Sequence, residues 1–169
     1  KRGQAGMDAA NVLPHANGII MHDCWSSYWK YQNVTHAICC AHLLRELNGV
    51  IENHPEQTWA VRFKKLLLDM KKVRDKALLL DKDEVSYYHR HKFDMEYDSI
   101  IKTAYGENPF PETPAKKRGR KKKSKVLNLI CRLYNYKESV CLFIKNLCVP
   151  FDNNQAERDL RMLKVKTKV

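Results

Sequence analysis

The sequence has no apolar run long enough to cross a membrane. A transmembrane helix needs about 20 consecutive, mostly apolar residues, whereas the apolar runs here, such as GIIM and LLL, are far shorter. The sequence also has no Gly-rich phosphate-binding loop, no nucleophilic Ser elbow and no aromatic RNA-binding motif. These absences argue against a membrane-spanning protein, a P-loop nucleotidase and a serine hydrolase.

Acidic residues are scarce relative to basic ones. The 169 residues include 31 Lys and Arg but only 19 Asp and Glu, which gives a net charge of +12. This balance favours a polyanionic partner, with nucleic acid first and an anionic membrane surface well behind it. The length corresponds to one domain, or to one domain with an insertion, and is sufficient for a sizeable hydrophobic core.

Cysteines are few, and their spacing is irregular. The six cysteines do not form a spaced secretory framework, so we expect reduced thiols and a cytoplasmic protein. His36, Cys39, Cys40 and His42 are close together and suggest zinc, but the chain has no paired C-x-x-C motif and no second, distant pair of ligands. Buried small cysteines in a strand are the alternative.

The first third of the sequence has an α/β pattern. Residues 18–21 (GIIM) are apolar and β-branched and run into HDCWSSYW, which is typical of a buried strand followed by a loop. Residues 35–40 (THAICC) form a second short apolar run. This run leads directly into AHLLRELNGVIE, whose apolar residues recur at helical spacing: Leu43, Leu44, Leu47 and Val50 or Ile51.

The middle of the sequence is predicted to be helical. One apolar stripe alternates steps of four and three: Trp59, Phe63, Leu66, Met70, Val73, Ala77 and Leu80. A second helical pattern follows: Tyr88, Phe93, Tyr97, Ile100 and Ile101. We interpret these stripes as the core of a hairpin or bundle, with a partner-binding coiled coil as the alternative. Residues 106–114 (GENPFPETP) break the pattern, and residues 126–147 resume a helix.

A strongly basic segment separates these helical patterns. Residues 115–125 (AKKRGRKKKSK) include eight Lys or Arg among eleven residues. Such a run is often a solvated loop, but contact with a phosphate backbone is the alternative in so basic a protein. The candidate DNA-binding residues of this segment are Lys117, Arg118, Arg120 and Lys121.

Two carboxylates are candidates for chemistry. Asp23 lies just beyond the first predicted strand, at the sheet edge where α/β proteins often place ligand and metal groups, or it caps the next turn. Glu157 lies in a predicted terminal helix, which Asp152 or Asn153 would cap, with Gln155 completing a capping box. Glu157 forms an ordinary ion pair with Arg161, or it holds a metal ion if the helix faces a phosphodiester. The basic residues that share its face are Arg161, Lys164 and Lys168.

Three blocks of the sequence resemble transposases of the insertion-sequence-66 family. In order, they are GIIMHDCWSSYWKY, CCAHLLREL and VPFDNNQAERDLRMLKVK, and the resemblance extends from about Leu13 to the last residue. It implies an RNase H-like core whose DDE triad uses two Mg²⁺ or Mn²⁺ ions to cleave and transfer DNA strands. It also implies DNA partners (transposon ends and target) and leaves self-association in a transposition complex open.

The resemblance assigns roles to individual residues. It makes Asp23 the second catalytic, metal-binding carboxylate and Glu157 the third. Its C-x-x-H element falls on Cys39 and His42, with a structural or substrate-positioning role. The residues expected to offer positive charge to DNA phosphates are Arg158, Arg161 and Lys164.

These assignments divide the chain into three parts. Residues 1–54 are expected to form part of the RNase H-like core, residues 55–148 a mostly helical insertion, and residues 149–169 the terminal core helix. The first catalytic aspartate is expected on a strand upstream of Asp23, but the stretch around Asp8 (MDAANVLPH) predicts a helix and a connection. We therefore expect a fragment that is inactive alone. The alternatives are a non-catalytic basic DNA-binding or assembly module and, more weakly supported, a zinc-binding regulator.

Overall fold

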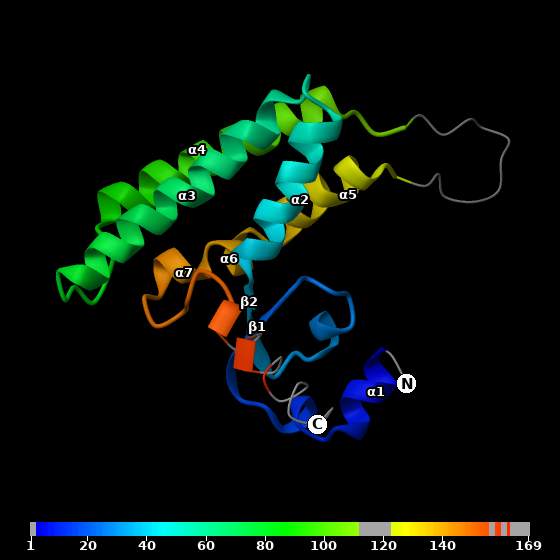
Figure 1. The fold of residues 1–169 in the computed structure, drawn as a ribbon, viewed down its shortest axis with the longest axis vertical. Helices are drawn as coiled ribbons and strands as arrows, with labels where there is room; N and C mark the ends of the chain where they lie inside the picture. Colours follow the sequence, from blue (N-terminus) through cyan, green and yellow to red (C-terminus); the bar gives the residue numbers. More distant parts are fainter. Residues whose placement is uncertain (1–2, 112–122, 156–157, 160–161, 163–169) are drawn as a thin grey trace, which may run out of the picture.

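The protein has a mixed α/β fold with one small sheet and many helices (Figure 1), which confirms the predicted α/β class. The computed structural model describes residues 3–111, 123–155, 158–159 and 162. Its elements are, in chain order, α1 (Gln4–Ala9), η1 (Leu13–His15), β1 (Gly18–His22), η2 (Tyr28–Lys30), β2 (Val34–Ile38), α2 (Cys40–Asn53), α3 (Thr58–Leu79), α4 (Tyr87–Glu107), α5 (Lys125–Asn135), α6 (Lys137–Val140) and α7 (Leu142–Lys145).

The sheet consists, in the described part of the chain, of the two parallel strands β1 and β2. Their register runs from Gly18 opposite Val34 to His22 opposite Ile38. Both strands were predicted from their short apolar runs, and the observed bounds differ from the predicted ones by no more than two residues. The predicted burial of residues 18–21 is wrong, because Ile19 is 43% exposed and Ile20 and Met21 are only half-buried. Because the strands are parallel, their carboxyl ends lie at the same edge of the sheet.

Helix α2 begins at this edge, directly after β2. Its predicted apolar spacing is confirmed, because Leu43, Leu47 and Val50 are buried while Leu44 and Ile51 pack against the core from half-buried positions. Amphipathic spacing of this kind buries one face of a helix and leaves the other in solvent. The side-by-side helices α2 and α5 lead from the sheet towards the base of the helical hairpin described next (Figure 1).

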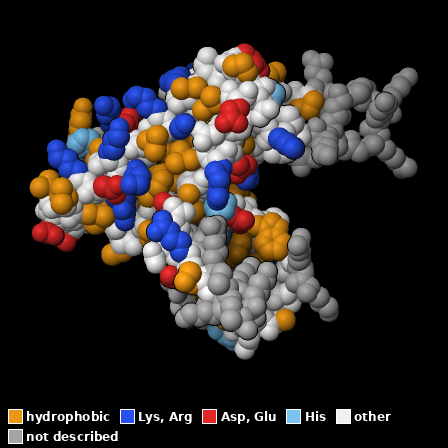
Figure 2. Space-filling view, in the orientation of Figure 1, with side chains coloured by type: hydrophobic (Ala, Val, Ile, Leu, Met, Phe, Trp, Pro, Cys, Tyr) orange, Lys and Arg blue, Asp and Glu red, His pale blue; other side chains and the backbone are white. Residues whose placement is uncertain are grey.

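Helices α3 and α4 form a long hairpin that reaches away from the sheet (Figure 1). The predicted intrachain core is confirmed, since the rings of Phe63 and Tyr97 meet edge to face with centroids 4.9 Å apart. Two predicted stripe residues lie outside it. Leu80 is 54% exposed because it follows the end of α3, and Tyr88 is 70% exposed in the first turn of α4. On the face drawn in Figure 2, Lys and Arg side chains are scattered over this hairpin among hydrophobic and acidic ones.

The single helix predicted over residues 126–147 is wrong, because the structure has three helices there. The backbone leaves helical geometry at Tyr136 (φ −115°, ψ 27°) and again at Cys141 (φ −89°, ψ 2°). These breaks turn the chain so that α6 and α7 both contact β2 and α7 also contacts α3. The predicted apolar residues Val140, Phe143 and Ile144 are nevertheless buried, in the same core as the sheet.

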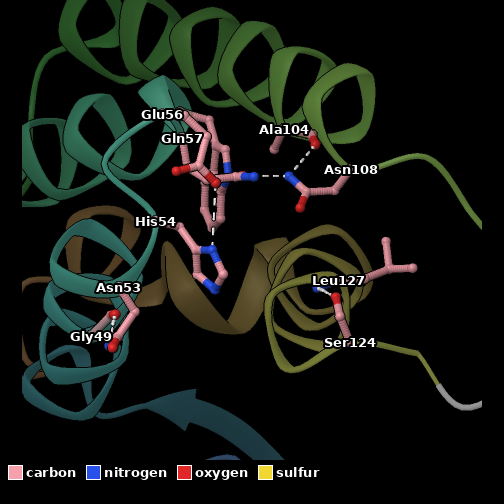
Figure 3. A network of polar contacts seen from close by, with 10 residues as sticks. Gly49, Asn53, His54, Glu56, Gln57, Ala104, Asn108, Ser124 and Leu127 are labelled. Carbon is pink, nitrogen blue, oxygen red and sulfur yellow. Dashed lines mark hydrogen bonds and ion pairs between the residues drawn. The ribbon is translucent and has the colours of Figure 1, made fainter.

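A polar network fixes the base of the hairpin (Figure 3). Gln57 Oε1 accepts hydrogen bonds from Trp59 Nε1 (2.7 Å) and from Asn108 Nδ2 (2.6 Å), which ties the start of α3 to the end of α4. At the start of α5, the Ser124 hydroxyl accepts a bond from the backbone N–H of Leu127 (3.0 Å) and caps the helix. Hydrogen bonds therefore hold the end of α4 and the start of α5, the helices before and after residues 112–122.

Two general predictions can be compared with the described residues. All six cysteines are free thiols, and Cys39 and Cys40 are buried. Within the described ranges, no helix is both long enough and apolar enough to span a membrane.

Candidate functional site

Asp23 lies at the carboxyl edge of the sheet, as its position after β1 predicts. The backbone continues the ladder at this edge, because the N–H of Cys39 donates to the carbonyl of His22 over 3.0 Å. The Asp23 side chain is exposed, whereas His22 and Cys24 on either side of it are buried. The fold therefore buries the neighbours of Asp23 and presents its carboxylate to solvent.

The turn that carries Asp23 has a specific, strained backbone. Cys24 adopts φ +70°, in the left-handed region that non-glycine residues seldom occupy. Two hydrogen bonds from consecutive backbone N–H groups hold this conformation. Cys24 N–H donates to His22 Nδ1 (3.1 Å), and Trp25 N–H donates to Asp23 Oδ1 (3.1 Å). The capping role considered for Asp23 is thus present, and it fixes the orientation of the carboxylate.

A hydrogen-bonded pair of histidines, His22 and His36, supports this turn. Since His22 Nδ1 accepts the Cys24 N–H, the proton of the neutral ring is on Nε2, which donates to His36 Nδ1 (3.0 Å). His36 Nε2–H then donates to the carbonyl of Tyr31 (2.9 Å). Burial, reinforced by His36, lowers the pKa of His22 from 6.5 to about 4, against the opposing effect of Asp23. His22 is therefore neutral at pH 7, in one tautomer.

Replacing His36 tests this chain of bonds. His36→Leu removes the acceptor for His22 Nε2–H, and we expect it to lower the free energy of unfolding by roughly 1–3 kcal/mol, as for a buried donor left unpaired. Urea unfolding would measure the loss. The matched control is His15→Leu, because His15 is exposed and its ring bonds to Asn11, four residues away. A change within about 0.5 kcal/mol is expected there. Equal losses in both variants would contradict the inferred support.

The start of the terminal segment is attached to the same edge of the sheet. Cys40 N–H donates to the carbonyl of Phe151 (3.0 Å), and Asn153 N–H donates to Cys39 Sγ (3.3 Å). Phe151 is buried and meets the ring of Phe143 edge to face at 5.0 Å. Residues 151–153 are therefore bound to the junction of β2 and α2, next to the edge where Asp23 lies.

The predicted cap of the terminal helix is present in altered form. Asp152 Oδ1 accepts a bond from the backbone N–H of Asn154 (3.0 Å), so Asp152 supplies the capping oxygen. The Gln155 side chain donates to Asp159 (3.0 Å), four residues on, instead of completing a capping box. Asn154, Gln155 and Arg158 are helical, and Arg158 is exposed.

Several predicted site residues lie outside the described residues. They are Glu157, Arg161 and Lys164 in the terminal segment, and Lys117, Arg118, Arg120 and Lys121 in the basic segment. Their proposed roles remain predictions from the sequence.

The Cys39 and His42 pair lies at the start of α2. Cys39 is the N-cap residue, and its carbonyl accepts a bond from the His42 N–H (3.1 Å). Both ring nitrogens of His36 are engaged, with His22 and with the Tyr31 carbonyl. In the part of the chain that the structure describes, no three His, Cys, Asp or Glu side chains converge as metal ligands. The Cys39 thiol instead contacts the terminal segment, and its role in the site remains a prediction.

Sequence reasoning missed Arg132 in α5. Its guanidinium pairs with both carboxylate oxygens of Glu46 in α2, and one of these bonds measures 3.1 Å. Burial raises the pKa of the Cys24 thiol, next to Asp23, and the positive charge of this guanidinium opposes that rise. Because Glu46 and Arg132 are 86 residues apart, no local spacing could have revealed the pair. The pair joins α5 to α2, the helix that begins at the sheet edge.

A comparison with protein families decides the family of the chain. A family model described as "Transposase IS66 family" matches residues 1–169. The chain belongs to the IS66 transposase family. No curated protein and no solved structure matches it. The predicted resemblance is confirmed, and membership in the family indicates an enzyme of DNA transposition, with DNA as its substrate.

Proposed function

We propose that this chain forms part of an RNase H-like DDE active site that cleaves DNA and transfers the cut strand, with Asp23 and Glu157 as metal-binding carboxylates. The observation that carries the proposal is the attachment of residues 151–153 to Cys39 and Cys40. It binds the start of the segment that contains Glu157 to the sheet edge where Asp23 lies.

The chemistry of Asp23 fits a hard divalent cation. Its carboxylate is exposed, it is held by one backbone hydrogen bond to Oδ1, and oxygen ligands are those that Mg²⁺ and Mn²⁺ prefer. When bound, two such ions would activate the attacking water or 3′-hydroxyl and stabilise the leaving oxygen.

The residues of the chain itself orient the carboxylates and the DNA. The bonds that Cys24 N–H donates to His22 and Trp25 N–H donates to Asp23 fix the turn of Asp23, which limits the directions from which its oxygens can bind a ligand. Arg158, Arg161 and Lys164 follow Glu157 in the sequence and would offer positive charge to phosphates. Lys117, Arg118, Arg120 and Lys121 would add contacts to the DNA backbone that carry no sequence information.

Metal removal tests the proposed chemistry. We expect DNA strand cleavage and transfer by the full-length protein to require Mg²⁺ or Mn²⁺ and to stop when EDTA is added, because the carboxylates act through bound ions. A gel assay with labelled DNA would follow both steps, and a binding assay on the same samples should show nearly unchanged affinity. Binding without metal-dependent cleavage under any condition would favour a non-catalytic DNA-binding or assembly module.

A further inference from the structure

A row of aromatic rings ends at Trp25, two residues from Asp23. The rings of Trp25 and Tyr28 meet edge to face with centroids 6.1 Å apart, and Tyr28 stacks on His22 at 4.6 Å. His22 contacts Trp29 edge-on at 5.0 Å, and Trp29 stacks on Tyr136 at 3.8 Å. The row thus runs from the loop after β1 to the junction of α5 and α6.

Exposure differs sharply along this row. His22 is buried, Tyr28, Trp29 and Tyr136 are half-buried, and Trp25 is 43% exposed. Trp25 is nevertheless not on a loose segment, because its N–H donates to Asp23 Oδ1 and its carbonyl accepts the Tyr28 N–H (3.1 Å). The backbone of Trp25 is therefore fixed by hydrogen bonds at its N–H and its carbonyl, while much of the indole surface is exposed to solvent.

The chain that carries Trp25 is strongly basic. Its net charge is +12, and the exposed Lys30 ends the η2 turn that follows Trp25, whereas Arg132 is already paired with Glu46. An exposed indole on a basic chain has the two features that single-stranded nucleic-acid sites combine, a stacking platform for bases and attraction for phosphates. A nucleobase on Trp25 would add one more ring to the existing row.

We propose that Trp25 stacks on an unpaired nucleobase of the DNA strand that is positioned at Asp23. The inference rests on the proposed function, which supplies the DNA. Because every base has a π-face, the contact would tolerate different DNA sequences. Its effect would be to position the DNA strand and not to read its sequence. It would fix one nucleotide at a set distance from the carboxylate and so select which phosphate is presented to it.

Fluorescence of a modified base tests the contact directly. Chain 1–169 would be titrated, without divalent metal, into DNA duplexes that carry a short single-stranded end with 2-aminopurine, whose fluorescence falls when it stacks. We expect Trp25→Leu to weaken binding roughly ten-fold and to abolish this quenching, whereas Trp25→Phe retains most of both. The slope of log affinity against log salt should stay unchanged in Trp25→Leu, because no phosphate contact is lost.

Two matched variants control the experiment. Tyr88→Leu makes the same kind of replacement at an aromatic residue that is 70% exposed in α4, and it should change neither affinity nor quenching. Lys121→Gln should show the complementary pattern to Trp25→Leu. We expect it to lower the slope of log affinity against log salt by about one and to leave the quenching of bound DNA intact. Circular dichroism would confirm that each variant is folded.

The outcomes separate the inference from the proposed function. If Trp25→Leu binds and quenches like the wild type while Asp23 variants lose strand transfer, the stacking inference is wrong and the proposed function stands. If Trp25→Leu keeps DNA binding and quenching but self-associates less in sedimentation, the ring covers a second copy of the chain, and the inference is again wrong. If the wild type does not bind DNA, the inference and the proposed function both fail.

Discussion

Asp23→Ala is expected to reduce strand transfer by the full-length protein by about a thousand-fold or more. Loss of a metal ligand removes several kcal/mol of transition-state stabilisation, and each 1.36 kcal/mol corresponds to a factor of ten in rate. Glu157→Ala should have an effect of similar size. DNA binding should change little in either variant, since phosphate contacts come from basic residues and not from these carboxylates. Quantified joining products and a filter-binding assay would measure the two quantities.

The matched control is Asp83→Ala. Asp83 is an exposed carboxylate in the turn between α3 and α4, far along the chain from the sheet. Its replacement removes the same charge, so it corrects for any general effect of charge on DNA binding, and near-normal strand transfer is expected. Normal strand transfer by either the Asp23 or the Glu157 variant would remove that residue from the proposed triad.

Trp59→Ala is expected to destabilise the protein by about 3–5 kcal/mol, a large part of the stability of a typical domain. The Trp59 side chain is fully buried at the base of the hairpin, and its Nε1–H donates to Gln57 Oε1. The substitution would leave a cavity and remove one donor from a nearly buried acceptor. Denaturant unfolding followed by circular dichroism would measure the loss.

Trp25→Ala is the natural comparison, because it removes the same side chain from an exposed position. We expect it to lower the free energy of unfolding by less than about 1 kcal/mol, as is common for surface substitutions. A small loss in both variants would mean that the base of the hairpin does not depend on Trp59. A large loss in both would mean that the Trp25 side chain is packed in solution, and the proposed exposed aromatic ring would then be wrong.

The regular elements were predictable from the sequence where local pattern and tertiary packing agree. The apolar stripes of α3 and α4 have one plausible burial direction, and most of their residues follow it. The strand at residues 18–21 is present as predicted, but it is not buried, because Ile19 is 43% exposed and Ile20 and Met21 are half-buried. In residues 126–147 the spacing favours a continuous helix, but packing against β2 and α3 requires two changes of direction. Those breaks depend on distant residues, so the local period could not predict them.

In the candidate site, too, residues with a local sequence signal were predicted, and contacts between distant positions were not. Asp23 became a candidate because a carboxylate directly after a predicted strand is a local signal, and Glu157 because it lies in a family motif. The bond between His22 and His36 was missed because it joins positions 14 residues apart, which the parallel register of β1 and β2 brings together. The Glu46 and Arg132 pair likewise depends on the packing of α5 beside α2. Contacts of this kind follow from the assembled fold and not from the spacing of motifs.

The most direct test of the account is the distance between the Asp23 and Glu157 carboxylates in a crystal structure of the protein soaked with Mn²⁺. We predict a separation within about 8 Å and an anomalous peak between the two groups, because ions about 3.5–4 Å apart, each about 2 Å from its oxygen ligands, span that gap. A Glu157 side chain paired with Arg161 far from Asp23, with no metal between the carboxylates, would contradict the proposed active site and favour a basic DNA-binding module.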